Sequence, residues 1–155
     1  MTGDPNTPPS LHAFFQADHR RCDALWVQVE EAVDAGDAAG IERTWHAFEQ
    51  ALRRHLDMEE ETLFPAFEAA SGMTGGGPTF VMRHEHRQMR GVLDLMAEAV
   101  RAGDPDDLLG QGDTLHLLAQ QHNTKEEGVL YPMAEQLLHG EWLALFEQLR
   151  TYLER

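Results

Sequence analysis

The sequence contains a single cysteine, Cys22, so an internal disulfide is impossible. Basic residues are also scarce, since 12 lysines and arginines face 27 acidic residues and the formal net charge is -15. That charge would repel nucleic acids and anionic membrane surfaces. No apolar run approaches the roughly 18 residues of a membrane span, and the opening MTGDPNTPPS lacks the basic and apolar regions of a signal peptide. We therefore expect no nucleic-acid partner, no membrane partner and a location in the reducing cytoplasm.

The length of 155 residues suits one domain, and a hydrophobic content of 42% is enough for one buried core. Residues 1–10 are rich in proline and polar residues, which predicts a flexible N-terminal leader. Residues 11–155 are expected to form the single domain.

Apolar residues recur at steps of three and four along four segments, as on the buried face of an amphipathic helix. The segments run from Leu11 to Val33, Ile41 to Phe67, Met82 to Val100 and Leu108 to Leu137. Ser10 can cap the first segment, Gly36 and Gly103 can end the first and third, and SGMTGGGP is the clearest loop. Short connections between long helices predict an all-α, up-down-up-down four-helix bundle, with a short C-terminal helix between Trp142 and Tyr152.

Ionisable residues interrupt the apolar face of every segment, at positions that should point into the core. They are His19, His55, Glu59, His86, His122 and Glu126. Two segments carry the same pattern, HLDMEEETLFPAFE from His55 and HNTKEEGVLYPMAE from His122, which agree at six places at an offset of 67. Each copy holds a His and a Glu at i and i+4, which lie on one helix face about 6 Å apart. Two facing helices would each supply a nitrogen and a carboxylate to one site.

Metal binding explains these six residues better than ordinary core hydrogen bonding does. A single histidine on a buried helix face is normally a hydrogen-bonded core residue. Several imidazoles and carboxylates buried without compensation would be costly, whereas metal ions turn their lone pairs into bonds. Mixed nitrogen and oxygen ligands suit iron and also admit zinc or manganese. We therefore predict that the six residues bind metal.

Helical phase separates the other ionisable residues from this set. His84 lies about 200° around the helix from His86 and should face solvent. The remaining histidines expected on outward faces or at helix ends are His46, His116 and His139. His12 is expected at the edge of the core. Glu60, Glu61 and Glu127 are expected on a solvated face, although Glu60 and Glu127 could instead support the ligands from behind.

Two other metal motifs fail their sequence tests. HEHRQ at His84 lacks the second histidine of the zinc-protease motif HExxH. The Glu-x-x-His pairs of ferritin-like di-iron bundles do not occur in the sequence. Protease and ferritin-like chemistry are therefore disfavoured.

The pattern resembles the hemerythrin-like family, also called HHE cation-binding domains, over residues 11–138. The matching motifs are DH at His19, HLDMEEETLFP from His55, EHRQM containing His86, and HNTKEEGVLYP from His122. The resemblance implies two iron ions bridged by Glu59, Glu126 and an oxo, hydroxo or water oxygen. It also implies that His19 and His55 bind one iron and that His86 and His122 bind the other. Oxygen, nitric oxide, peroxide or azide would be the exogenous ligand.

The chain departs from the oxygen-carrying members of that family. Those members have a fifth histidine one turn from the third-helix ligand, where this chain has Met82 and Arg90. Their last carboxylate is an aspartate five residues after the fourth-helix histidine. Here the last carboxylate is Glu126, four residues after His122. The resemblance then implies a di-iron protein that binds or reacts with oxygen, nitric oxide or peroxide in sensing, storage or detoxification. The alternative is a di-iron enzyme of iron-sulfur or nitrosative-damage repair, or of peroxide turnover.

Overall fold

A computed structural model describes residues 7–155, which are almost entirely helical. The helices are α1 (Leu11–Asp34), α2 (Ala38–Met58), α3 (Phe64–Ser71), α4 (Pro78–Arg101), α5 (Pro105–Lys125), α6 (Tyr131–Leu137) and α7 (Trp142–Leu153). A short 3-10 turn, His139–Glu141, precedes α7. The described residues contain no strand, so the all-α prediction is confirmed. The predicted leader of residues 1–10 falls largely on residues 1–6, which lie outside the described residues.

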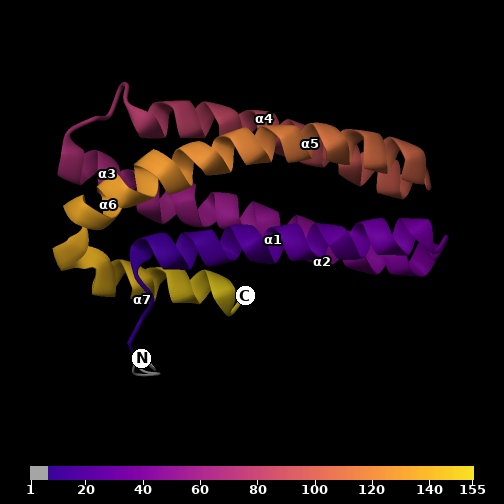
Figure 1. The fold of residues 1–155 in the computed structure, drawn as a ribbon, viewed down its shortest axis with the longest axis horizontal. Coiled ribbons are helices and arrows are strands. Elements are labelled where there is room, and N and C mark those ends of the chain that lie inside the picture. The colour runs from indigo at the N-terminus through magenta and orange to yellow at the C-terminus, as the bar shows by residue number, and fades with distance from the viewer. Residues whose placement is uncertain (1–6) are drawn as a thin grey trace.

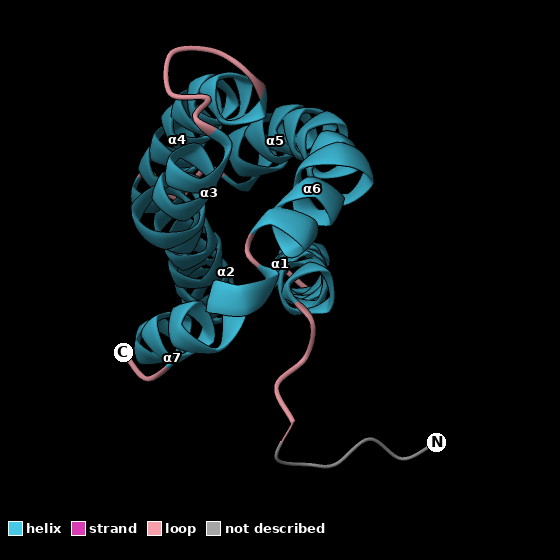
Figure 2. Ribbon diagram, turned by 90° about the vertical axis from the view of Figure 1, so that its left-hand side faces the viewer, coloured by secondary structure: helices cyan, strands magenta, loops and turns pink. Residues whose placement is uncertain are grey.

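The helices form four long rods that run side by side, and the chain reverses direction between successive rods (Figure 1). The first and third rods are α1 and α4, whereas α2 continues into α3 and α5 continues into α6. The α1 and α2 helices pack together, and so do α4 and α5, so each pair forms a helical hairpin. The α7 helix lies outside the rods, next to α2 (Figure 2). The expected C-terminal helix is therefore present.

The long helices begin and end where the local chemistry favours it. The Ser10 side chain caps α1 by accepting a hydrogen bond from the backbone N–H of Ala13, as predicted. Asp37 caps α2 in the same way. Gly36 and Gly103 each have a φ of 65°, a left-handed conformation that allows the chain to turn back after α1 and α4.

Two π-helical turns interrupt rods that the sequence predicts as continuous helices. They span Glu59–Leu63 and Glu126–Leu130 and therefore lie at equivalent places in the duplicated motifs. Each turn is followed within two residues by a proline, Pro65 or Pro132, which cannot donate a backbone hydrogen bond and crowds the preceding turn. The wider π turn removes that conflict without breaking the rod, and such turns are frequent at functional sites.

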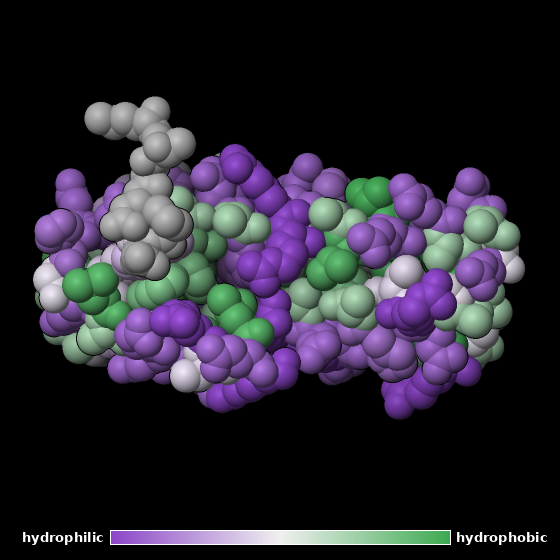
Figure 3. All heavy atoms as spheres, turned by 90° about the horizontal axis from the view of Figure 1, so that it is seen from below, coloured by the Kyte–Doolittle hydropathy of each residue, from purple (hydrophilic) through white to green (hydrophobic). Residues whose placement is uncertain are grey.

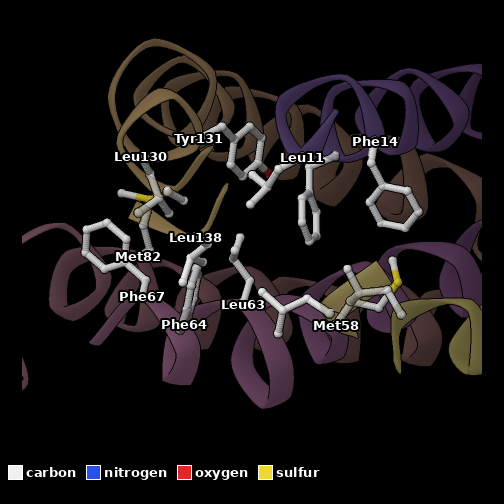
Figure 4. Packing of buried hydrophobic residues seen from close by; sticks show 14 of the residues in the cluster. Leu11, Phe14, Met58, Leu63, Phe64, Phe67, Met82, Leu130, Tyr131 and Leu138 are labelled. Atoms are coloured by element: carbon white, nitrogen blue, oxygen red, sulfur yellow. The ribbon is translucent and has the colours of Figure 1, made fainter. Parts of the chain in front are cut away.

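Two hydrophobic clusters occupy the interior, one toward each end of the rods. The first contains Phe14, Phe64, Phe67 and Tyr131, and α7 covers it with Leu145 and Leu149 (Figure 4). The second cluster contains Val29, Trp45, Phe48, Leu93, Met96 and Leu108. Apart from Thr62 and Thr79, the buried polar and charged residues lie on the rods where these two clusters meet. The apolar ends therefore leave one polar layer in the middle of the molecule.

The surface is largely hydrophilic, with separate hydrophobic patches on the face that Figure 3 shows. Several large apolar side chains are exposed, including Phe80, Leu117 and Leu143. None of the helices among residues 7–155 combines the length and the apolar character that a membrane span requires.

A close approach between α1 and α5 depends on a glycine. Gly112 is buried on α5, and a Cβ atom built there would lie 2.3 Å from Cζ2 of Trp26 on α1. Gly110, on the same helix, has no neighbouring atom within 4 Å of the corresponding position. Gly112 therefore provides the space for the Trp26 ring.

We expect Gly112→Ala to lower the free energy of unfolding by about 1–3 kcal/mol, because the ring of Trp26 must shift. The matched control is Gly110→Ala, which should leave stability unchanged or raise it by up to about 1 kcal/mol through helix propensity. Urea unfolding followed by circular dichroism measures both. Equal stabilities for the two variants would show that the α1–α5 contact does not require a glycine.

Candidate metal centre

The six core-facing ionisable residues meet in the polar layer between the two hydrophobic clusters. They are His19 of α1, His55 of α2, Glu59 at the start of the first π-helical turn, His86 of α4, His122 of α5, and Glu126 at the start of the second. All six are at most 5% exposed. Every rod thus contributes one histidine, and the second and fourth rods add the carboxylates.

One oxygen of each buried carboxylate lies between two imidazoles. The distances are 3.2 Å from Glu59 Oε1 to Nε2 of His55 and of His86, and 3.0 and 3.1 Å from Glu126 Oε1 to Nε2 of His19 and of His122. The Nε2 atoms of His86 and His122 are also only 3.2 Å apart. All four Nε2 atoms therefore point toward the same small volume as the carboxylates.

Buried polar atoms without hydrogen-bond partners make this cluster a candidate metal site. Three such atoms are His55 Nε2, Glu59 Oε1 and Glu126 Oε2, because the 3.2 Å contacts of Glu59 Oε1 with the imidazoles lack hydrogen-bond geometry. An unsatisfied buried polar atom costs about 1–3 kcal/mol, and more when it is charged. Two groups have donor atoms that all lie within 4.8 Å of one another: Glu59, His86, His122 and Glu126, and His19, His55 and Glu126. Imidazole and carboxylate donors at this spacing fit iron, zinc or manganese.

Each of the four imidazoles turns its other ring nitrogen, Nδ1, toward a carboxylate on a neighbouring rod. The pairs are His19 with Glu127 at 2.8 Å, His55 with Asp18 at 2.8 Å, His86 with Glu60 at 3.2 Å, and His122 with Glu85 at 3.0 Å. Because an ionised carboxylate only accepts, Nδ1 carries the proton in each pair. When a metal ion replaces any proton on Nε2, the lone pair of that nitrogen faces the centre, as metal binding requires.

The 67-residue offset relates these supporting carboxylates as well. Asp18 corresponds to Glu85, and Glu60 corresponds to Glu127. Glu60 and Glu127 support histidines from behind, which is the alternative left open by the sequence. Sequence reasoning missed Asp18 and Glu85, although each directly precedes a core-facing histidine in the dipeptides DH and EH. The contacts close a ring around the centre, from α1 to α2, α4, α5 and back to α1.

The central carboxylates favour positive charge in this layer. Burial opposes a charged imidazole, but the charge of Glu59 and a hydrogen bond to Asp18 hold the pKa of His55 well above its ordinary value. Burial acts the same way at His86, where the adjacent carboxylates of Glu59 and Glu60 raise the pKa to about 9. Burial also opposes the charge of Glu59, but the adjacent His55 holds the pKa of that carboxyl well below its usual range. Glu59 therefore remains ionised and attracts cations.

Tyr131 adds a buried hydroxyl that the sequence did not assign to the centre. Its oxygen lies 2.7 Å from Glu59 Oε2, 3.0 Å from Glu126 Oε1 and 3.1 Å from His19 Nε2. Burial and the two carboxylates raise the pKa of Tyr131 well above its usual value, so the hydroxyl remains a donor. Phe64 stands at the equivalent position of the other motif. The first copy of the duplicated motif therefore has no corresponding hydroxyl.

The residues expected elsewhere lie outside this cluster. The exposed histidines are His46, His84, His116 and His139, and His12 is partly exposed. Met82 is buried in the first hydrophobic cluster. Arg90 Nη2 donates to Asp57 Oδ1 at 2.8 Å and to Glu60 Oε2 at 2.6 Å. Because Arg90 is engaged by two carboxylates, it does not present a free guanidinium to an anionic ligand.

Comparison with known proteins gives one family match. The model of the hemerythrin HHE cation binding domain matches residues 10–134, a range that contains all six central residues. No solved structure matches the chain.

Two curated relatives are similar to part of the chain. The iron-sulfur cluster repair protein YtfE of Edwardsiella ictaluri (strain 93-146) is 35% identical over 75 residues, which are 46% of this chain and 34% of the relative. The protein of the same name from Dickeya chrysanthemi (strain Ech1591) is 36% identical over 56 residues, or 36% of this chain and 25% of the relative. The similarity therefore spans about a third or less of each relative's length.

We expect Glu85→Ala to weaken zinc binding about 10–100-fold, because His122 loses the carboxylate that orients its ring. Glu98→Ala is the matched control, since Glu98 lies exposed on the same helix and pairs only with Arg101 among the described contacts. Competition with a chromophoric chelator measures the affinity of both variants. Unchanged affinity for Glu85→Ala would contradict a supporting role for this carboxylate.

Proposed function

This chain belongs to the family of hemerythrin HHE cation binding domains, and from that premise we propose that it binds two iron ions. The proposed ligands are His19, His55, Glu59, His86, His122 and Glu126. The convergence of four Nε2 atoms on two buried carboxylates, with three buried atoms lacking hydrogen-bond partners, carries the proposal. Zinc or manganese could occupy the same donors, because imidazole and carboxylate ligands are permissive.

We further propose that the two carboxylates bridge the metal ions. Glu126 belongs to both groups of donors with metal-binding spacing, and Glu59 lies between His55 and His86, one from each helical hairpin. His19 and His55 would bind one ion, and His86 and His122 the other. An iron pair bridged in this way, with a further oxo, hydroxo or water oxygen, supplies redox chemistry and a position for an exogenous ligand.

The proposed activity is binding of, or reaction with, oxygen, nitric oxide or peroxide, in sensing, storage or detoxification. Two observations argue against reversible oxygen carriage. Met82 and Arg90 flank His86 along α4 and cannot supply a further imidazole. The last carboxylate is Glu126, four residues after His122, whereas the oxygen carriers have an aspartate five residues after the histidine.

The domain, its helix topology, its partner and its location are also proposed. We propose that residues 11–155 form one domain with the topology of an up-down-up-down four-helix bundle, supported by the reversals between successive rods. A small uncharged or peroxide ligand, rather than nucleic acid or a membrane, is the proposed partner, because the net charge is -15. A cytoplasmic location is part of the same proposal.

A second candidate function is repair of iron-sulfur clusters or of nitrosative damage. The observation that favours it is the partial similarity to two proteins named for iron-sulfur cluster repair. The two candidates differ in what leaves the protein. A repair protein should transfer iron to a damaged [4Fe–4S] protein and restore its cluster, whereas a binding module should retain its iron during the same incubation.

Reconstitution with ferrous iron under argon should load about two iron ions per chain. His86→Ala should lose most of this iron, because His86 faces both Glu59 and His122. His84→Ala is the control on the exposed face of the same helix and should load normally. Elemental analysis measures iron per chain. Trace iron in the parent protein would contradict the proposed function, and loss of iron in His84→Ala alone would contradict the ligand assignment.

Exposure of the reduced, iron-loaded protein to oxygen should oxidise it without reversal on purging. The reason is that α4 supplies no fifth imidazole, so the iron pair would be less fully ligated and more open to water. Stopped-flow absorption followed by an argon purge measures the outcome. A spectrum that persists in oxygen and disappears fully on purging would instead support an oxygen carrier.

A further inference from the structure

Two of the four supporting carboxylates are held in place without a hydrogen bond from a cation. Asp18 is 1% exposed, so its own burial fixes it, and the guanidinium of Arg21 lies 3.3 Å from its Oδ1 without making a hydrogen bond. Glu127 is partly exposed, and the neutral amide of Gln16 donates to its Oε1 at 2.8 Å. These two carboxylates support the histidines of α1 and α2, which form the α1–α2 side of the centre.

The other two supporting carboxylates each accept a hydrogen bond from a cation. Arg90 donates to Glu60, and Lys125 donates to Glu85. Both carboxylates support histidines of α4 and α5, which form the α4–α5 side of the centre. At the 67-residue offset, the equivalents of the two cations are Asp23 and Met58. The cations therefore depart from the repeat and serve one side of the centre.

The contact of Glu60 with His86 depends on the position of Arg90. It is the longest of the four contacts between a histidine and its supporting carboxylate, at 3.2 Å. The oxygen involved, Glu60 Oε2, also accepts from Arg90 Nη2 at 2.6 Å. The other three carboxylates use different oxygens for the histidine and for the second partner. One oxygen can accept both donors through its two lone pairs, so Arg90 decides where the oxygen that faces His86 lies.

Arg90 is itself anchored to a second rod. The same atom, Nη2, donates to Asp57 Oδ1 at 2.8 Å, so Arg90 of α4 joins α2 to the first π-helical turn, which contains Glu60. Glu60 is 27% exposed, and without Arg90 its carboxylate is free to turn toward water. Arg90 therefore acts on the centre through Glu60, one residue after the proposed ligand Glu59.

We propose that Arg90 is a positioning residue of the metal centre, which holds Glu60 behind His86 and makes the α4–α5 side depend on ion pairs for its hold on a metal ion. The inference rests on the proposed function for the presence of that ion. It adds a difference between the two metal positions. Salt screens an ion pair near the surface, whereas it has little effect on a buried carboxylate or a neutral amide. Metal binding on the α4–α5 side should therefore weaken more with ionic strength.

Substitution of Arg90 tests the positioning role. Arg90→Gln should weaken zinc binding on the α4–α5 side about 3–10-fold, because the oriented support of His86 is lost. Arg90→Lys should restore most of the affinity, since one nitrogen makes both contacts and an ammonium can replace it. Arg87→Gln is the matched control, because Arg87 is exposed on the same helix and its loss changes the net charge equally. Competition with a chromophoric chelator measures affinity, and ¹⁵N spectra of the imidazoles assign each zinc ion to its side.

Ionic strength tests the difference between the two sides. From about 0.1 to about 1 M salt, the Debye length falls from about 10 to about 3 Å. Zinc affinity on the α4–α5 side should then fall about 3–10-fold more than on the α1–α2 side. Because screening of the net charge of -15 acts on both sides, the comparison between sides removes it. Arg90→Gln should reduce the excess, whereas Arg90→Lys and Arg87→Gln should retain it. The chelator is calibrated at each salt concentration.

Asp57→Asn is a second variant, in case Arg90→Gln does not fold. Asp57 is 44% exposed and reaches the centre only through Arg90 among the contacts of residues 7–155. Its substitution should weaken zinc binding on the α4–α5 side in the parent protein and have no further effect in Arg90→Gln, as expected for two residues that act through one contact.

The outcomes separate this inference from the proposed function. Unchanged or tighter zinc binding in Arg90→Gln would overturn the positioning role, and tighter binding would show that the guanidinium acts mainly by repelling the metal ion. Equal salt dependence on the two sides, or no recovery in Arg90→Lys, would overturn the dependence on an ion pair. In each of these cases two bound zinc ions would leave the proposed metal centre standing. A parent protein that binds no zinc would contradict the proposed metal centre and this inference together.

Discussion

The burial of two carboxylates, Glu59 and Glu126, is the constraint on which the arrangement of the molecule depends. Each would be prohibitively costly in an apolar interior alone, so each is bracketed by imidazoles from different rods. Those imidazoles in turn need acceptors for their Nδ1 protons, which Asp18, Glu60 and their two counterparts provide. Hydrogen bonds and ion pairs therefore extend outward from the centre in layers. Near solvent, Arg90 and Lys125 donate hydrogen bonds to the outermost carboxylates.

The repeat of 67 residues explains why the layers are so regular, and two of the positions that depart from it are buried in the interior. The six central residues, the supporting carboxylates and the π-helical turns all recur at the same offset. The repeat breaks at Tyr131, where the other half has Phe64, and at Gly112, where the other half has Trp45. One break adds a hydroxyl that hydrogen-bonds to the central carboxylates, and the other makes room for the ring of Trp26. The repeated positions therefore support the proposed metal ligands, whereas these exceptions distinguish the halves of the chain.

Periodicity predicted the helices and the inward position of the six central residues, because burial leaves a period of 3.6 in the sequence. It did not predict the π-helical turns, since Pro65 and Pro132 relieve their strain through a backbone adjustment that hydrophobic spacing does not record. Asp18 and Glu85 were missed because each serves a histidine on another rod. The contact between Trp26 and Gly112 was missed for the same reason: it joins α1 to α5, and no local pattern in either segment requires it.

The pairing of α1 with α2 and of α4 with α5 bears on how the protein folds. Each helical hairpin is built from contacts between neighbours in sequence, so its formation should be fast and low in loop-closure entropy. Neither hairpin alone assembles the full donor set, because Glu126 from the second completes the group formed by His19 and His55 from the first. The donor groups are therefore completed when the hairpins dock. A metal ion bound there would join the two halves of the chain, so its binding would stabilise the docked state over the separate hairpins.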